Sequence, residues 1–223
     1  YVFIPRVFSY PNLKMGAHRN EDFGNMINGT TGQVSTTCIL KDVDSRALID
    51  FAAVHNSNND FALNGPQNIK ANLRNYWCNG TPLPPLKSSS TEAEVNENFG
   101  EFTSTVTKLL VLQESKGYGE LIRNIKEGNI EEISPTDEIT KALFNIDMDA
   151  EGSNSVRSRQ KKEAEDKEAS NIYKAGSVVV FKNLKKNKFG IMIIRSVNVD
   201  FDAVKATNDA NATITFDLYY QRY

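Results

Sequence analysis

The sequence has few of the residues and motifs on which most enzyme sites are built. Its 223 residues include only two histidines, His18 and His55, and neither lies in a G-x-S-x-G nucleophile elbow. No H-x-x-x-H or C-x-x-C spacing occurs, so the sequence gives no support for a transition-metal site. Because G-x-G-x-x-G and G-x-x-x-x-G-K-[ST] are also absent, we do not expect nucleotide-dependent chemistry.

Long apolar runs and an excess of one charge are lacking as well. No run approaches the roughly 18 to 20 apolar residues of a membrane helix. Lys and Arg total 26 and Asp and Glu total 28, and this formal net charge of −2 gives no broad basic face for nucleic acid. Residues 1–5 (YVFIP) are strand-like and contain no initiator Met, so we expect a mature or trimmed chain.

Cysteine is scarce, with Cys38 and Cys78 alone in the chain. Two cysteines carry no spacing signature of the kind that marks a disulfide scaffold. They can form one disulfide or be two small buried hydrophobic residues, and the sequence leaves both alternatives open.

The clearest secondary structure lies at the C-terminal end, where three strands are predicted. Residues 177–184 (SVVVFKNL) and 189–197 (FGIMIIRSV) are apolar in both alternating sets, so they need cover on both faces. The four polar residues between them suit a hairpin. The third strand, residues 212–220, alternates apolar with polar side chains, which predicts one face in water.

The N-terminal part also has β character. Two short extended segments, residues 1–9 and 12–17, flank Pro11, which cannot donate to a central ladder and therefore predicts an edge strand. Further strand-like runs follow at 33–40 and 48–55. The second of these is apolar on both faces except at Asp50.

The middle of the chain has helical segments between loops. Three prolines within residues 81–85 exclude regular structure there, and the polar, acidic residues 88–101 predict a loop. Residues 102–112 suit either a strand or a helix. Helices are predicted at 118–126 and 139–144, and residues 155–173 predict a solvated helix or a mobile arm.

These elements predict an α+β fold. Its antiparallel sheet, or sandwich-like sheet, takes strands from both chain ends and has an α-rich segment in the middle. We expect a single domain over residues 1–223, with 82–175 as a helical and loop excursion between the two β regions.

One acidic motif resembles the start of a calcium loop. Asp147, Asp149 and Glu151 alternate along the chain, and a glycine occupies the sixth position, Gly152. The motif fails at position twelve, where Ser158 replaces the bidentate Glu, so a solvated acidic turn is the simpler interpretation. Calcium at these three carboxylates is the one cofactor for which the sequence offers a candidate.

One aromatic pair is a candidate ligand-binding site. Tyr76 and the lone Trp77 lie beside the proline-rich break, where an exposed ring can serve as a platform for a sugar. The simpler interpretation is that Trp77 anchors that segment onto the core, because tryptophan is mostly buried in proteins.

Several short strings resemble an uncharacterised domain that recurs in exported surface lipoproteins of gut Bacteroidetes. They occur in the expected order at both β ends, and the sequence departs from the pattern at His18 and Met192. The strings are residues 13–17, 23–24, 32–34, 49–51, 58–66, 181–182, 188–191 and 214–216.

The resemblance implies a location in the cell envelope, at the outer-membrane surface or in the periplasm. It also implies a lipid-anchored N-terminus that the present chain no longer carries, and it supplies no catalytic residues. The leading hypothesis is a non-catalytic envelope module that binds a glycan or a surface protein, or that is structural. The alternative is a hydrolase of polysaccharide or cell wall that uses carboxylates such as Asp50 or Asp147.

Overall fold

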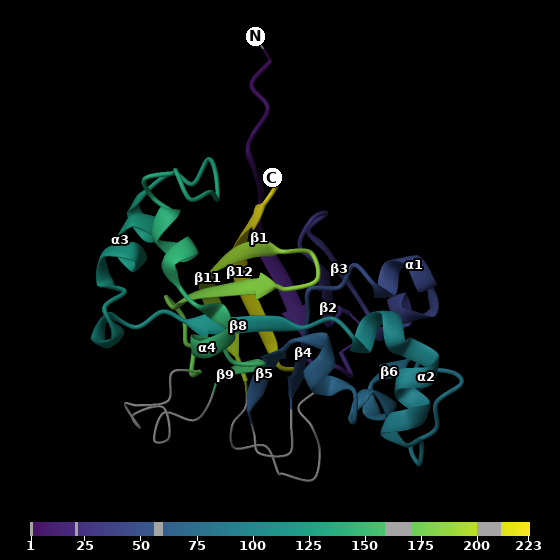
Figure 1. Ribbon diagram of the computed structural model, residues 1–223. Helices are drawn as coiled ribbons and strands as arrows, with labels where there is room; N and C mark the ends of the chain where they lie inside the picture. Colours follow the sequence, from purple (N-terminus) through teal and green to yellow (C-terminus); the bar gives the residue numbers. More distant parts are fainter. Residues whose placement is uncertain (1, 21, 56–59, 159–170, 200–210) are drawn as a thin grey trace.

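Two five-stranded antiparallel sheets form the centre of the molecule (Figure 1). The computed structural model describes residues 2–20, 22–55, 60–158, 171–199 and 211–223. The first sheet has the order β1 (Val7–Gly16), β12 (Thr213–Gln221), β11 (Lys188–Asn198), β10 (Val178–Asn183) and β8 (Thr107–Val111). The second has the order β3 (Gln33–Ser35), β2 (Met26–Asn28), β4 (Phe51–His55), β5 (Phe61–Asn64) and β9 (Ser155–Ser158).

One hydrophobic core joins the two sheets. The ring of Phe51 on β4 meets Phe181 on β10 edge-on, with ring centroids 5.1 Å apart, and lies 6.4 Å from Phe216 on β12. All three side chains are fully buried. Since these residues come from both sheets, the sheets pack face to face as in a sandwich.

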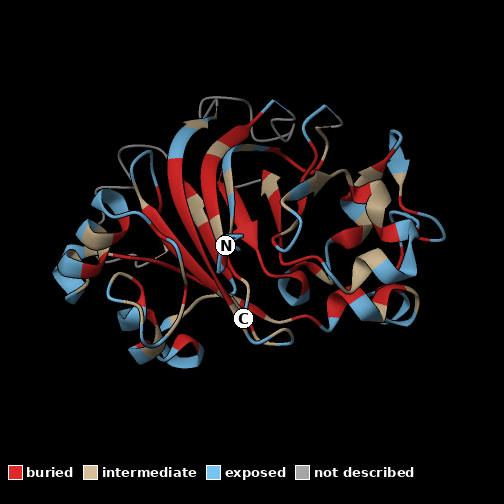
Figure 2. Cartoon of the chain, turned by 90° about the horizontal axis from the view of Figure 1, so that it is seen from above, coloured by how far each residue is buried: buried red, intermediate tan, exposed pale blue. Residues whose placement is uncertain are grey.

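Helices cover the two outer faces, as the view from above shows (Figure 2). The longer α2 (Glu92–Thr103) packs on the second sheet, and α3 (Gly119–Glu127) packs on the first. The remaining helical turns are η1 (Thr37–Lys41), α1 (Val43–Arg46), η2 (Pro66–Ile69), η3 (Leu73–Asn75), η4 (Glu114–Lys116), η5 (Lys141–Asn145) and α4 (Met148–Glu151). A small ribbon, β6 (Trp77–Cys78) with β7 (Thr81–Pro82), lies beside α2. In the described residues, no helix is long and apolar enough to cross a membrane.

The predicted hairpin is present, with β10 paired to β11, and both faces of these strands are covered as expected. The predicted wet face of the last strand, β12, is wrong because most of that face is covered. Thr213 and Asp217 on that face are buried, and Tyr219 packs against the α3 layer. Asp217 can be buried because it accepts hydrogen bonds from Arg195 and from the backbone N–H of Asn12.

The predicted edge strand is confirmed as β1, which lies at the end of the first sheet. It continues through Pro11 instead of ending there. The pairing with β12 shifts register between Tyr10 and Leu13, and Asn12 has a positive φ of 53°. A bulge of this kind accommodates a proline, because the proline is not required to donate to the ladder.

The middle of the chain differs most from the prediction. The predicted loop at 88–101 is wrong from Glu92 onward, where α2 begins with a capping box: Thr91 and Glu94 each bond to the other's backbone N–H. Residues 107–111 and 155–158 are edge strands, β8 and β9, so the middle also contributes to both sheets.

Two predicted helices have mixed outcomes. The helix predicted at 118–126 is confirmed as α3 and ends before Gly128, but 139–144 contains only the 3-10 turn η5. The solvated helix predicted at 155–173 is wrong at its start, because residues 155–158 pair with β5. Its continuation over 159–170 lies outside the described residues.

Candidate functional site

A pocket of about 520 Å³ lies against the outer face of the second sheet. Side chains of β5 alternate between the two faces of the second sheet. Phe61 and Leu63 point into the core between the sheets, so Ala62 and Asn64 face outward and form part of the pocket floor. The floor residues are Val54, Ala62, Asn64, Ser155 and Arg157. The segment that contains η2 and η3 forms a wall with Asn68, Ile69, Asn72, Asn75 and Tyr76, and the remaining lining residues are His18, Arg19 and His55.

Buried polar atoms that lack a hydrogen-bond partner are concentrated at this pocket. Over the part of the chain that the structure describes, they include Arg19 Nε, Asn64 Nδ2, Tyr76 Oη and Arg157 Nε. Native proteins leave few such atoms, and each one costs about 1–3 kcal/mol. Their concentration at one cavity indicates that water or a ligand supplies the missing partners.

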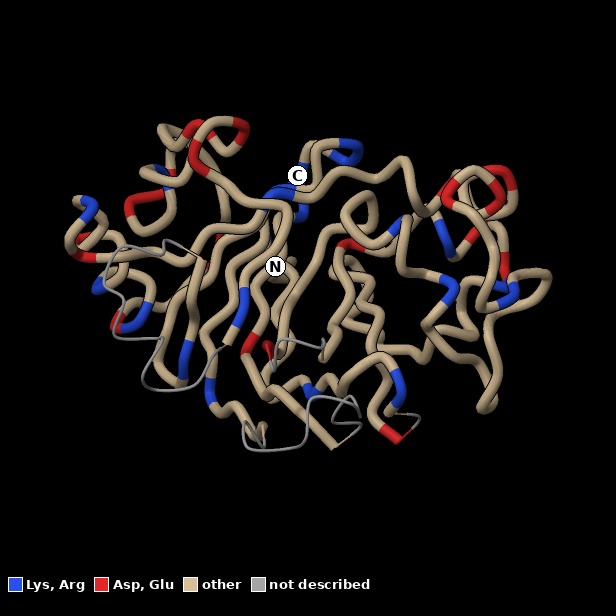
Figure 3. The backbone as a smooth tube through the Cα atoms, turned by 90° about the horizontal axis from the view of Figure 1, so that it is seen from below, with Lys and Arg blue, Asp and Glu red and all other residues tan. Residues whose placement is uncertain are grey.

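The electrostatics of the pocket are locally positive, although both signs are interspersed over the molecule as a whole (Figure 3). Arg157 forms an ion pair with Asp60, with Nη1 and Oδ2 3.3 Å apart. Arg19 makes no ion pair with any described residue, and its guanidinium lies 4.2 Å from the centre of the Trp77 ring. Burial, together with the charges of Arg19 and His55, lowers the pKa of His18 to about 3, so His18 is neutral at pH 7.

Of the two predicted aromatic residues, Tyr76 lines this pocket and Trp77 contacts the lining residue Arg19. Tyr76 is 1% exposed, lines the cavity and packs its ring against His18, with the centroids 4.9 Å apart. Burial raises the pKa of Tyr76 well above its ordinary value. Trp77 is half-buried, and its ring carries the Arg19 side chain instead of lining the cavity. That the two residues bind a ligand stays a prediction.

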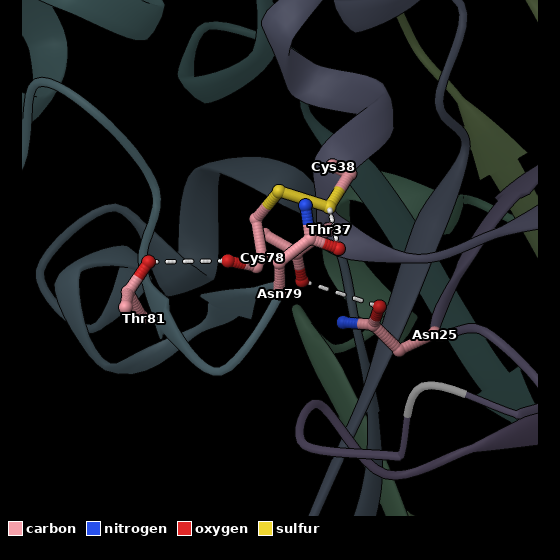
Figure 4. Close-up of a disulfide and its surroundings, with 6 residues drawn as sticks. All are labelled: Asn25, Thr37, Cys38, Cys78, Asn79 and Thr81. Atoms are coloured by element: carbon pink, nitrogen blue, oxygen red, sulfur yellow. Dashed lines mark hydrogen bonds between the residues drawn. A yellow bond between two sulfur atoms is a disulfide. The ribbon is translucent and has the colours of Figure 1, made fainter.

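A disulfide between Cys38 and Cys78 holds the wall of the pocket in place (Figure 4). It links η1 to β6, directly after Tyr76 and Trp77. Hydrogen bonds support it on both sides, from Thr37 to Asn25 and from Thr81 to the carbonyl of Cys78. The alternative that the sequence left open is thereby decided in favour of the disulfide.

Two of the three carboxylates of the calcium candidate, those of Asp147 and Glu151, accept hydrogen bonds from neighbouring groups. Asp147 caps α4 by accepting from the backbone N–H groups of Asp149 and Ala150, and Glu151 accepts from the hydroxyl of Tyr118. Burial, the hydrogen bond to Glu151 and the charge of Glu151 raise the pKa of Tyr118 to about 12. Among the described residues, no three His, Cys, Asp or Glu side chains form a metal-binding group. Calcium binding here stays a prediction.

Tyr118 and Glu151 also line a second pocket of about 510 Å³, which lies beside α3 and η5. None of the buried polar atoms without a hydrogen-bond partner in the described residues belongs to its lining. The pocket beside Tyr76 is therefore the better candidate.

Asp50, the polar exception in its strand, is fully buried between the two sheets. Its carboxylate accepts hydrogen bonds from four donors: Gly29 N (2.7 Å), Asn183 Nδ2 (2.8 Å), Lys186 Nζ (3.0 Å) and Tyr220 Oη (3.0 Å). Gly29 is required for this approach, since a Cβ there would lie 2.4 Å from the Tyr220 ring. Asp50 therefore joins the sheets, and both of its oxygens are occupied.

Sequence reasoning missed most of the pocket, including Arg19, Asn64 and Arg157, because its walls come from distant segments. One signal was present in the sequence. Asn68, Asn72 and Asn75 recur at intervals of four and three residues, which is the spacing that places side chains on one side of a helical segment.

Comparisons with known proteins identify a fold and no activity. No family model matches the chain, and no curated protein matches it. The crystal structure of a DUF4466 family protein from Parabacteroides merdae is similar, with a TM-score of 0.51 and 13% sequence identity. The alignment covers 99% of this chain and 55% of that protein, so the chain spans about half of its length. The chain thus shares its fold with a domain of unknown function from a gut Bacteroidetes genus.

Proposed function

We propose that this chain is a non-catalytic binding module of the cell envelope and that the pocket beside Tyr76 is its glycan-binding site. The observation that supports this proposal is the group of unpartnered polar atoms beside the apolar side chains of Val54 and Ala62 on the pocket floor. Sugar rings present hydroxyl groups at their edges and C–H groups on their faces. A site with convergent amide, guanidinium and phenol groups beside aromatic and aliphatic carbon suits both features.

Two observations support the envelope location. A disulfide persists in oxidising compartments such as the bacterial periplasm or the cell surface, and Cys38 and Cys78 form one here. The structural neighbour comes from Parabacteroides, in line with the resemblance to exported lipoproteins of gut Bacteroidetes. We therefore include a lipid anchor preceding this segment in the proposal.

The hydrolase alternative has less support from this pocket. Most glycoside hydrolases use a pair of carboxylates about 5 to 9.5 Å apart. The described residues that line the pocket include no Asp or Glu, and Asp50 is buried elsewhere with its oxygens occupied. Binding is thus the activity that the geometry supports best.

The test is a glycan-array screen of the purified chain beside two variants, Tyr76→Phe and Trp77→Ala. We expect specific binding by the parent chain and weaker binding by both variants, because one loses a hydrogen-bonding group and the other loses the surface that holds Arg19. Tyr223→Phe is the matched control, since Tyr223 is 70% exposed and does not line the pocket. Silence of the folded parent chain across the array would contradict the proposal and direct attention to protein partners.

A further inference from the structure

We infer that the pocket selects a glycan that carries a carboxylate, such as a uronic acid residue, over a neutral glycan. The inference rests on the proposed function, because it specifies the ligand class of the same pocket. It follows from three properties of the lining: which polar atoms lack partners, which charges lack counterions, and how Arg19 is held.

Donors outnumber acceptors among the unpartnered pocket atoms named above. Arg19 Nε, Arg157 Nε and Asn64 Nδ2 can only donate hydrogen bonds, and Tyr76 Oη can donate or accept. Asn64 is 5% exposed and Tyr76 is 1% exposed, so bulk water does not simply solvate these groups. The carbonyl oxygen of Asn64 is already used, since it accepts from Asn68 Nδ2 at 2.8 Å. A ligand that matches this surplus of donors must present acceptors.

The charge of the pocket favours an anion. The charge of Arg157 is already compensated by its ion pair with Asp60, whereas Arg19 has no counterion among the described residues. His18 adds no positive charge at pH 7 because its pKa is about 3. The described lining residues include no carboxylate to repel an anionic ligand. Among the described residues, Arg19 is therefore the positive charge at the pocket that no carboxylate compensates.

The position of Arg19 suits a planar carboxylate. Its guanidinium lies over the Trp77 ring, and this cation–π contact limits the freedom of the side chain before a ligand arrives. A guanidinium held in this way can donate two parallel hydrogen bonds to one carboxylate, and charge-assisted pairs of this kind are stronger than neutral ones. The neighbouring amides remain available for hydroxyl groups, which distinguishes a sugar acid from a simple anion.

The experiment is isothermal titration calorimetry of the full chain with three probes. Trigalacturonic acid is the acidic glycan, and its methyl ester has the same sugars without the charge. Triglutamate places carboxylates on a peptide backbone. We expect trigalacturonic acid to bind at least about ten-fold more tightly than either of the other probes, since a charge-assisted hydrogen bond contributes enough for about a ten- to hundred-fold change.

Two variants test the residues. Arg19→Gln should weaken binding of trigalacturonic acid by about ten-fold or more and leave the methyl ester nearly unaffected. Asn64→Asp should also weaken it, because it keeps the acceptor for Asn68 and replaces the donor with a negative charge. Arg123→Gln, on the exposed side of α3, removes the same charge far from the pocket lining and serves as the control.

The outcomes separate this inference from the proposed function. Equal binding of the acid and its ester would overturn the inference and leave a glycan site in place. Binding of triglutamate with the same affinity as trigalacturonic acid would also overturn it, because the pocket would then recognise charge and not a sugar. An Arg19→Gln variant with unchanged affinity would overturn it as well. Absence of binding to either glycan, together with silence on the array, would overturn both proposals.

Discussion

At the scale of single residues, the burial of His18 makes stability depend on pH. The unfolded chain takes up a proton at the ordinary pKa near 6.5, whereas His18 in the fold, facing Arg19 and His55, stays neutral down to about pH 3. Between these values the unfolded state binds more protons, so the free energy of unfolding falls as the pH falls, by at most about 1.4 kcal/mol per pH unit. Above pH 7 this contribution is constant.

Urea unfolding at pH 7 and pH 5 checks this prediction. The free energy of unfolding of the parent chain should fall by up to about 2 kcal/mol from pH 7 to pH 5, and that of the His18→Gln variant should fall much less. An equal loss in the two proteins would assign the pH dependence to other groups.

A comparison of two buried tyrosines tests whether Tyr76 is part of a ligand site. Tyr76→Phe removes a hydroxyl that has no partner, so the free energy of unfolding should stay the same or rise by about 1 kcal/mol. Tyr173→Phe removes a hydroxyl that donates to the carbonyl of Phe61 at 2.8 Å, so it should lower stability by about 1 kcal/mol. Both side chains are 1% exposed, which makes the pair well matched. Denaturant unfolding measures both values, and a loss at Tyr76 equal to that at Tyr173 would contradict the assignment.

At the scale of secondary-structure elements, Asp50 connects the start of β4 with β10 and β12 through Asn183 and Tyr220. Asp50→Ala should lower the free energy of unfolding by about 3–5 kcal/mol, because the charge of Lys186 would lose its buried partner. Asp147→Ala, which removes a cap from the four-residue α4, should lower it by only about 1 kcal/mol. Similar losses in the two variants, measured by denaturant unfolding, would show that Asp50 is not a central connection.

The disulfide between η1 and β6 should stabilise both the fold and the pocket wall. Replacing Cys38 and Cys78 by serine should lower the free energy of unfolding by about 2–4 kcal/mol and weaken glycan binding. Thermal melts with and without a reducing agent provide the measurement. The parent chain should respond to the reductant and the double variant should not, whereas a response of both would indicate another cause.

The elements that could be predicted from the sequence are those whose surroundings are local. The β10–β11 hairpin is recognisable because both of its strands and its turn are contiguous in sequence. The environment of β12 was missed because the burial of Asp217 depends on Arg195 and on Asn12, which is 205 residues away. The start of α2 was available in the capping box of Thr91 and Glu94, but the acidic composition around it favoured a loop.

At the scale of the whole molecule, local sequence patterns predict the fold, whereas the site depends on contacts between distant segments. An α+β fold with antiparallel strands follows from hydrophobic alternation, which is a local property. The pocket is assembled from the segment that follows β1, from β4, β5 and β9, and from the segment of η2 and η3. No periodicity indicates that Arg19 and Arg157 line one cavity, because that depends on how the second sheet and its outer layer pack.

The pairing of β1 with β12 also determines when the first sheet can form during synthesis of the chain. Val7 pairs with Gln221, so β1 cannot pair until the segment of β12 is present. The same strand β12 is also the partner of β11. Contacts of such high sequence separation slow folding, because a long loop must close before they contribute. A ribosome that has not yet released residues 213–223 therefore holds a chain whose first sheet is incomplete.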